Sequence, residues 1–428
     1  MTLLRIAPPN GELNAVIAVP GSKSIANRAL ICAMLADGDS RLLGLPSGDD
    51  TNVIVSVLSE LGILTRIGEG EVLVSGNRKV RLPGIIDAQL AGTSSRFLSA
   101  VAGLCGSTTI IDGGDALRSR PMTDLHEALI GLGADVTPLG ESGHLPVSIS
   151  AGSMVGGEIS IRGDVSSQFI SALMLIAPVL PRGLVITIDG PLVSRSYVEM
   201  TARVMNSFGV AVELTNSRIE IVQSLYRACE YNIEPDYSSA AFPLACVVLR
   251  AGEVRVPFLA TSHLQGDSAI TKILEAMGVT CLTEGHDVVV RRDASTMLRP
   301  IDMDMSDCSD LVPVVASVCT VIAGDSRISG VGFIRNKESD RLADLADEIN
   351  RSGGECEVLS DGLVIHGGHE LHPEVFQTHH DHRLAMALSL LSLVTGEARV
   401  RDSDVVSKSW PNYFDDMAPI LGASVSEN

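Results

Sequence analysis

Several predicted helix starts in the sequence carry lysine, arginine and hydroxyl side chains together, and these residue types bind phosphate and carboxylate groups. One helix is predicted to begin after Ser22, whose hydroxyl can cap its free amides. Lys23, Ser24 and Arg28 lie in its first two turns, and Ser24 and Arg28 share a face at i, i+4 spacing. The P-loop spacing is absent, so the segment predicts either another kind of anion site or an ordinary capped helix with surface cations.

A second turn of small residues leads into another helix. Gly92 in this turn would let a ligand approach the backbone closely, and Thr93 and Ser94 offer hydroxyls that can cap the helix. Arg120 stands just before a helix predicted to open at Pro121. Plain capping explains these features equally well.

Two further helix starts are rich in hydroxyl groups. Ser166 and Ser167 head a very apolar helix, with Gln168 directly after them. Ser194 and Tyr197 open another. Because the free amides of a helix start attract anions, each predicts either an anion site or simple capping.

Carboxylates gather in the second half of the chain. Four of them precede an apolar helix at its start, namely Asp302, Asp304, Asp307 and Asp310. Farther on, Lys337, Glu338 and Arg341 have spacings that place all three on one face of a predicted helix. Carboxylates among cations are typical of acid–base sites that handle anions, and also of solvated helix faces.

Two late segments complete the set of candidates. The run from His379 to Arg383 allows three interpretations: a metal site, an anion site around Arg383, or a structural cluster. Metal ligation is disfavoured because no further ligand follows at a suitable spacing. Lys408 lies on the predicted loop before the last helix, where a single lysine is usually solvated.

The elements that would position these residues form a repeat. Six times, an amphipathic helix ends in glycine and is followed by a strand, a turn and a second strand, at intervals of about 70 residues. The glycines, each expected to end its helix in the left-handed conformation, are Gly62, Gly133, Gly209, Gly278, Gly353 and Gly422. One of the strands is predicted from the alternation of Val210, Val212 and Leu214. We therefore expect six related βαβ-type units in two lobes of three, although any α/β protein contains some helix–glycine–strand segments.

Length and charge limit the partners. The chain has 428 residues, a formal net charge of −20 and 3% aromatic residues. Nucleic acid is not expected as a partner, because phosphate contacts need excess Lys and Arg and base stacking needs aromatic rings. A membrane is not expected either, since basic segments and a signal-like apolar start are missing. The eight cysteines form no C-x-x-C pair and predict reduced core residues of a cytoplasmic protein.

The motifs together resemble those of the 5-enolpyruvylshikimate-3-phosphate synthase family. The matching segments, from about residue 6 to 422, are PGSKSIANRAL, LAGTSSRFL, RSRPM, VSSQFISALM, SRSY, NKESDRL, DHRLAMALSL and SKSWPNYF. The resemblance implies an α/β fold, a two-lobed inside-out α/β barrel of the enolpyruvyl transferase type, with six βαβαββ repeats and the helices inside. It implies one lobe of residues 1–20 plus 235–428 and a second lobe of residues 21–234.

The resemblance also implies a reaction, in which phosphoenolpyruvate and shikimate 3-phosphate give an enolpyruvyl ether and phosphate without metal or organic cofactor. Shikimate 3-phosphate would be bound by Lys23, Ser24, Arg28, Ser166, Ser167, Gln168, Ser194, Tyr197, Asp307 and Lys337. Phosphoenolpyruvate would be bound by Lys23, Gly92, Arg120, Gln168, Arg341, Arg383 and Lys408. Asp307 would accept the 5-hydroxyl proton, Glu338 would donate a proton to the methylene carbon, and Lys23 would assist. The enzyme is expected to be a cytoplasmic monomer.

The sequence departs from the family pattern at three positions. Leu90, Phe97 and Phe333 stand where the family usually has Asn, Pro and Asn, which bears on substrate affinity more than on reaction type. Gly92 is retained, so inhibition by glyphosate is expected. One alternative is a UDP-N-acetylglucosamine enolpyruvyl transferase, which is disfavoured because the loop directly before Arg120 contains no cysteine and the Ser166-Ser167-Gln168 segment is present. The other is a non-catalytic anion-binding protein on the same scaffold.

Overall fold

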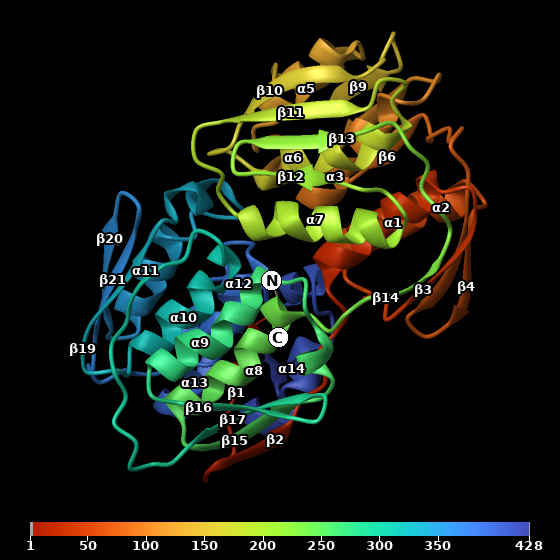
Figure 1. The fold of residues 1–428 in the computed structure, drawn as a ribbon. Coiled ribbons are helices and arrows are strands. Elements are labelled where there is room, and N and C mark those ends of the chain that lie inside the picture. The colour runs from red at the N-terminus through yellow and green to blue at the C-terminus, as the bar shows by residue number, and fades with distance from the viewer. Residues whose placement is uncertain (1–2, 428) are drawn as a thin grey trace. The chain divides into compact units, whose positions relative to one another are not determined.

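The computed structural model describes residues 3–427 and divides into two compact units. Unit 1 comprises the residues up to Pro20 together with those from Glu234 onward, and unit 2 comprises Gly21–Ile233. Figure 1 shows both as mixtures of helices and strands. The strands form six four-stranded sheets, three in each unit, which confirms the predicted sixfold repeat.

Unit 2 builds its three sheets in the orders β14-β3-β5-β4, β6-β7-β9-β8 and β10-β11-β13-β12. Its strands are β3 (Gly38–Leu43), β4 (Leu64–Gly68), β5 (Glu71–Gly76), β6 (Ile85–Asp87), β7 (Thr109–Asp112), β8 (Asp135–Pro138), β9 (Val147–Ser150), β10 (Gly157–Arg162), β11 (Leu184–Asp189), β12 (Glu213–Leu214), β13 (Arg218–Ile221) and β14 (Glu230–Asn232). Its helices are α1 (Lys23–Leu35), α2 (Asp49–Glu60), α3 (Gly92–Ala102), α4 (Asp115–Arg118), α5 (Thr123–Leu132), α6 (Ser167–Ile176), the 3-10 turn η1 (Ala177–Val179) and α7 (Arg195–Ser207).

Unit 1 has the orders β16-β17-β15-β2, β18-β19-β21-β20 and β22-β23-β1-β24. Its strands are β1 (Leu3–Ile6), β2 (Leu13–Val16), β15 (Gly252–Val256), β16 (Thr280–Glu284), β17 (Asp287–Arg292), β18 (Asp302–Asp304), β19 (Gly324–Ser329), β20 (Glu355–Leu359), β21 (Gly362–Gly367), β22 (Val375–Phe376), β23 (Ala398–Arg401) and β24 (Val425–Glu427). Its helices are α8 (Tyr237–Leu249), η2 (Leu259–Thr261), η3 (Gly266–Ser268), α9 (Ala269–Ala276), η4 (Ser309–Leu311), α10 (Val312–Cys319), η5 (Gly332–Asn336), α11 (Ala343–Arg351), α12 (His382–Ser389), α13 (Ser392–Thr395), η6 (Ser403–Lys408), α14 (Tyr413–Asp416) and α15 (Ala418–Leu421).

Every sheet combines one parallel pair with antiparallel pairs, and in five of the six sheets two consecutive strands form an antiparallel hairpin. In the third sheet of unit 2, β10 and β11 are parallel and joined by helix α6, while β12 and β13 form the hairpin. Parallel neighbours need a crossover connection, and the crossover helices α3, α6, α10 and α12 are almost completely buried, as are α1 and α8. The helices therefore lie inside each unit with the sheets around them, as expected (Figure 1).

Segments distant in sequence complete three of the sheets. Strand β14 pairs in parallel with β3, with Tyr231 opposite Leu42. Strand β2 pairs in parallel with β15, with Ala15 opposite Val254. Strand β1 lies between β23 and β24 and is antiparallel to both. The first strands of the chain thus belong to two sheets of unit 1.

The six repeat glycines all adopt positive φ angles, between 70° and 100°. Gly133 ends its helix in the predicted left-handed conformation, whereas Gly422 has a ψ of 169° and is not left-handed helical. One strand prediction is wrong, because β12 comprises only Glu213 and Leu214 and does not include Val210 or Val212. The amide of Val210 donates to the carbonyl of Met205 at 3.0 Å and so closes the end of helix α7 instead of joining a sheet. No helix within residues 3–427 is long and apolar enough to cross a membrane.

Candidate active site

Arg341 is the centre of a buried charged group in unit 1. Its Nε lies 2.6 Å from Asp381 Oδ2, its Nη1 2.9 Å from Asp310 Oδ1, and its Nη2 2.7 Å from Glu338 Oε2. The residue is only 1% exposed. Burial by itself lowers the pKa of a guanidinium, but the three carboxylates outweigh it and raise the pKa of Arg341.

Asp310 joins Arg341 to a second buried arginine. Arg383 Nη2 lies 2.9 Å from Asp310 Oδ2. Burial raises the pKa of Asp310, yet Arg383, Arg341 and Lys337 together lower it well below its usual range. The carboxylate is therefore held ionised between two guanidinium groups. Asp310 was predicted as one of four carboxylates before an apolar helix and not as a site residue. Its position directly before that helix is the feature of the sequence that could have indicated its place in this group.

Glu338 bridges Arg341 and a third cation. Lys408 Nζ lies 2.7 Å from Glu338 Oε1, and Lys408 is 6% exposed. The general expectation that a loop lysine is solvated does not hold at Lys408. Three cations and three carboxylates thus share one network in unit 1.

The segment that carries Glu338 and Arg341 is not helical, so the prediction of a helix opening at Lys337 is wrong. It lies between η5 and α11. Asp340 Oδ1 accepts hydrogen bonds from the amides of Leu342 and Ala343, which starts the helical turn only after Asp340. The ion pair between Glu338 and Arg341 forms nonetheless.

The histidine-rich run places one residue in the charged group. Asp381 caps helix α12, because its carboxylate accepts a hydrogen bond of 2.8 Å from the amide of Arg383. The same carboxylate forms an ion pair with Arg341. His379 instead lies 3.1 Å from Glu348. Among residues 3–427, no group of three or more His, Cys, Asp and Glu side chains could hold a metal ion.

Two other candidates of unit 1 lie in different surroundings. Asp307 is an exposed residue and lies three positions before Asp310 in the sequence. Lys337 Nζ lies 5.9 Å from the ring centroid of Phe333, within reach of a cation–π interaction. The departure from the family pattern at Phe333 therefore provides an aromatic neighbour for a candidate cation.

In unit 2, Lys23 is the first residue of α1 and its Nζ lies 2.8 Å from Asp50 Oδ2. Ser22 is the N-cap residue, but its hydroxyl makes no capping hydrogen bond within the described chain, so that prediction is wrong. The carbonyl of Ser22 accepts the amide of Ala26 at 2.8 Å, which begins the helix through the backbone alone.

Arg28 is buried among neutral partners. Its guanidinium donates to Thr201 Oγ1 at 2.7 Å, to Ser171 Oγ at 3.1 Å and to the carbonyl of Ser24 at 2.8 Å. The rings of Phe97 and Tyr197 lie 5.4 and 5.8 Å from its Cζ. Burial lowers the pKa of Arg28 to about 10. The departure at Phe97 thus supplies one of the two rings against this arginine.

The hydroxyl-rich helix starts are partly as predicted. Ser166 caps α6 by accepting the amide of Gln168 at 3.3 Å, which confirms its capping role. The side chain of Gln168 accepts a hydrogen bond of 2.6 Å from Arg96. Ser194 is the N-cap residue of α7 in a left-handed conformation. The carbonyl of Tyr197 accepts a hydrogen bond of 2.7 Å from Thr201 Oγ1.

Gly92 lies beside two arginines. It is the first residue of α3, so Thr93 and Ser94 lie inside the helix and the prediction that they cap it is wrong. A Cβ atom at Gly92 would lie 2.6 Å from Arg96 Nη1 and 3.0 Å from Arg120 Nη1. The helix start and the two guanidinium groups therefore form a compact cationic feature.

The helix after Arg120 was predicted to begin at Pro121. Helix α5 begins two residues later, at Thr123.

A family model described as EPSP synthase (3-phosphoshikimate 1-carboxyvinyltransferase) matches residues 8–417. The chain belongs to the EPSP synthase family. Among its relatives, the 3-phosphoshikimate 1-carboxyvinyltransferase of Methanothermobacter thermautotrophicus is 36% identical over 96% of this chain and 97% of the relative. The enzyme of the same name from Trichormus variabilis is 34% identical over 99% and 100% of the two chains. A solved EPSP synthase from Acinetobacter baumannii matches 100% of both chains with a TM-score of 0.83 at 23% identity, and so shares the fold.

The family, the fold class and the enzyme class expected from the resemblance are thereby confirmed. The EPSP synthase family transfers an enolpyruvyl group from phosphoenolpyruvate to shikimate 3-phosphate. The roles of individual residues stay predictions.

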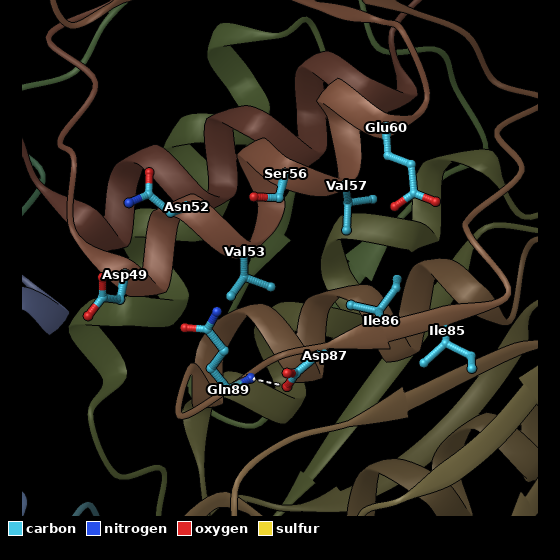
Figure 2. Close-up of a pocket in the computed structure, with 10 residues that line it drawn as sticks. All are labelled: Asp49, Asn52, Val53, Ser56, Val57, Glu60, Ile85, Ile86, Asp87 and Gln89. Carbon is cyan, nitrogen blue, oxygen red and sulfur yellow. Dashed lines mark hydrogen bonds between the residues drawn. The ribbon is translucent and has the colours of Figure 1, made fainter.

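One pocket of unit 2 in this EPSP synthase family member has a volume of about 300 Å³ and is lined by none of the candidate arginines and lysines (Figure 2). Its described lining consists of Asp49, Asn52, Val53, Ser56, Val57, Glu60, Ile85, Ile86, Asp87 and Gln89. The three carboxylates of this lining would repel phosphate and carboxylate groups. This pocket is therefore poorly suited to bind anions.

Proposed function

We propose that this chain is an enzyme that transfers the enolpyruvyl group of phosphoenolpyruvate to the 5-hydroxyl of shikimate 3-phosphate and releases phosphate. The observation that carries the proposal is the buried group in unit 1, in which Glu338 and Asp310 share the cations Arg341, Arg383 and Lys408. The reaction joins two polyanions and needs both a proton donor and a proton acceptor. Carboxyl groups set among cations meet both needs.

Phosphoenolpyruvate is assigned to the residues that the family resemblance names for it, which are Lys23, Gly92, Arg120, Gln168, Arg341, Arg383 and Lys408. Phosphate becomes a feasible leaving group only when its charge is neutralised, and fixed arginine and lysine side chains do this without reorganisation.

Shikimate 3-phosphate is assigned to Lys23, Ser24, Ser166, Ser167, Gln168, Ser194, Tyr197 and Lys337. The start of α6 offers free amides and hydroxyls to a phosphate group. Arg28 is 1% exposed and bonded to Ser24 and Tyr197, so we assign it the task of bracing these two residues.

Glu338 is assigned the proton that goes to the methylene carbon. Protonation builds positive charge at the neighbouring carbon, which the 5-hydroxyl oxygen attacks to form a tetrahedral adduct. An incoming substrate anion competes with Glu338 for Lys408 and Arg341, which frees the carboxyl group to carry a proton. Glu338 recovers a proton when phosphate leaves and the enolpyruvyl double bond forms.

The acceptor of the 5-hydroxyl proton is assigned to Asp310, with Asp307 as the alternative. Asp310 is bound to Arg341 and Arg383, whereas Asp307 is exposed. When a substrate anion draws these arginines toward itself, the pKa of Asp310 rises from its low value and the carboxylate becomes a better base.

Two matched variants test this assignment. Asp310→Asn and Asp307→Asn make the same chemical change three residues apart. We expect Asp310→Asn to lower kcat by roughly 10²–10⁴-fold and Asp307→Asn to change it only a few-fold. The reverse order would return the role to Asp307.

Phosphate release from phosphoenolpyruvate tests the function itself. Release with shikimate 3-phosphate as acceptor, and not with UDP-N-acetylglucosamine, is the expected result. Release only with UDP-N-acetylglucosamine would favour the sister activity, and binding without release from either would favour a non-catalytic anion-binding protein. Glu338→Gln should keep substrate binding and lose turnover by roughly 10²–10⁴-fold.

The proposal extends to the setting of the reaction. We place the protein in the cytoplasm as a monomer, without nucleic acid or membrane partners and without a cofactor. The acidic composition and the eight free cysteines support this setting.

A further inference from the structure

Asp50 is a buried carboxylate to which none of the roles above applies. It is 3% exposed, and its Oδ2 lies 2.8 Å from Lys23 Nζ. Its Oδ1 is also buried and makes no hydrogen bond within residues 3–427. Burying a carboxylate with one oxygen unsatisfied is unfavourable for folding. A contribution to stability therefore does not explain why a carboxylate occupies position 50.

The two helix starts explain why Lys23 needs a partner. Lys23 is the first residue of α1, and no acidic residue lies in the first turn of that helix. The positive end of the helix dipole repels a cation there. Asp50 lies in the first turn of α2, where the dipole favours a carboxylate. The ion pair therefore places an ammonium group at a position that α1 alone disfavours.

Asp50 also connects Lys23 to the start of α3. Its backbone carbonyl accepts a hydrogen bond of 2.5 Å from Ser94 Oγ, and Ser94 Oγ accepts one of 3.3 Å from Asn27 of α1. Ser94 and Asn27 are fully buried. Since Gly92 lies two residues before Ser94, one buried network fixes the segments that carry Lys23 and Gly92.

We propose that Asp50 is a positioning residue that holds the Lys23 ammonium in place beside the start of α3 for enolpyruvyl transfer. The inference rests on the proposed function. A lysine side chain has four rotatable bonds, and fixing them before the substrate arrives is worth about 10–30-fold in kcat/KM.

Asp50→Asn and Asp49→Asn form a matched pair of variants. Both remove one negative charge from the first turn of α2, and Asp49 is an exposed residue that lines the pocket in Figure 2. We expect Asp50→Asn to lower kcat/KM for phosphoenolpyruvate by about 10–30-fold, and Asp49→Asn to stay within about twofold of the parent.

A double-variant cycle distinguishes positioning from a structural defect. If Asp50 acts through Lys23, adding Asp50→Asn to Lys23→Met produces no further loss. A structural defect would persist in the Lys23→Met background. Where turnover is too slow, the Kd of shikimate 3-phosphate measured by calorimetry replaces kcat/KM.

The outcomes separate the two levels of inference. A parent protein that binds both substrates but releases no phosphate contradicts the proposed function. An active parent with near-normal Asp50→Asn, or with a further loss in the Lys23→Met background, overturns the role of Asp50. If Asp50→Asn does not fold, Asp50→Glu keeps the charge but displaces the carboxylate by one methylene. It should lose at least about threefold in kcat/KM, and an unchanged value would overturn the role.

Discussion

Replacing Asp267 by asparagine is expected to stabilise the protein increasingly as the pH rises. Asp267 is 3% exposed and accepts a hydrogen bond from Ser238. Burial, followed by the nearby Asp310, raises the pKa of Asp267 from 3.8 to about 7, although Arg383 opposes this. The native state must therefore either keep this proton or bury a second charge near Asp310.

The sign and size follow from proton linkage. Between pH 3.8 and 7 the native state binds more protons at Asp267 than the unfolded state, so the free energy of unfolding falls as the pH rises. The loss is complete above the native pKa. Between pH 5 and pH 9 it amounts to roughly 3 kcal/mol, at about 1.4 kcal/mol per pH unit up to the native pKa. Asparagine does not titrate, so the variant escapes this loss.

Thermal or denaturant unfolding at pH 5 and pH 9 checks the prediction. The stability difference between variant and parent should shift in favour of the variant by roughly 3 kcal/mol from pH 5 to pH 9. Any fixed loss from an unsatisfied amide at position 267 cancels, because it is the same at both pH values. Asp287→Asn is the control. The amide of Phe258 and Arg255 lower the pKa of Asp287, so this carboxylate is ionised in the native and the unfolded state throughout pH 5–9, and the stability difference between this variant and the parent should not change with pH. A pH-independent difference at position 267 would refute the reasoning.

Other predictions concern glycine and arginine positions. Gly92→Ala should raise the KM for phosphoenolpyruvate by at least about tenfold, because its Cβ would lie 3.0 Å from Arg120 Nη1. Glyphosate should inhibit the parent at roughly millimolar concentration, and unchanged phosphate release would contradict this. Gly133→Ala should lower the free energy of unfolding by about 1–3 kcal/mol, and Gly62→Ala by only about 1 kcal/mol. A Cβ atom at position 133 would lie within 3.0 Å of backbone atoms, whereas a Cβ atom at position 62 would have no neighbour within 4 Å. Arg28→Lys should lower the melting temperature, since an ammonium group cannot reproduce all the hydrogen bonds that the Arg28 guanidinium donates to Thr201, Ser24 and Ser171.

The repeat was predictable because its signals are local. A helix that turns back into a strand needs a left-handed residue at its end, and glycine adopts that conformation without strain. Gly133, with φ of 100°, and Gly278, with the same angle, therefore mark helix ends in the sequence as in the structure. The burial of Leu345 and Ile349 likewise follows from helical spacing.

The pairing of charges was not predictable, because it depends on contacts between distant segments. Lys408 reaches Glu338 across 70 residues, and Lys23 reaches Asp50 across 27. Neither spacing has a periodic signature. The non-helical segment around Glu338 was also missed, because its side-chain spacing fits a helix while Asp340 delays the helix start.

The location of β1 between β23 and β24 has a consequence for biosynthesis. Unit 2 is complete once Ile233 has been made, whereas β1 must wait about 390 residues for its partners at Ala398–Arg401, and longer for Val425–Glu427. At about 5–20 residues per second, translation leaves β1 unpaired for about 20–80 s. The order of folding on the ribosome thus differs from the order of synthesis: unit 2 can fold first, although β1 precedes it in the chain and reaches its native partners only after unit 2 has been made.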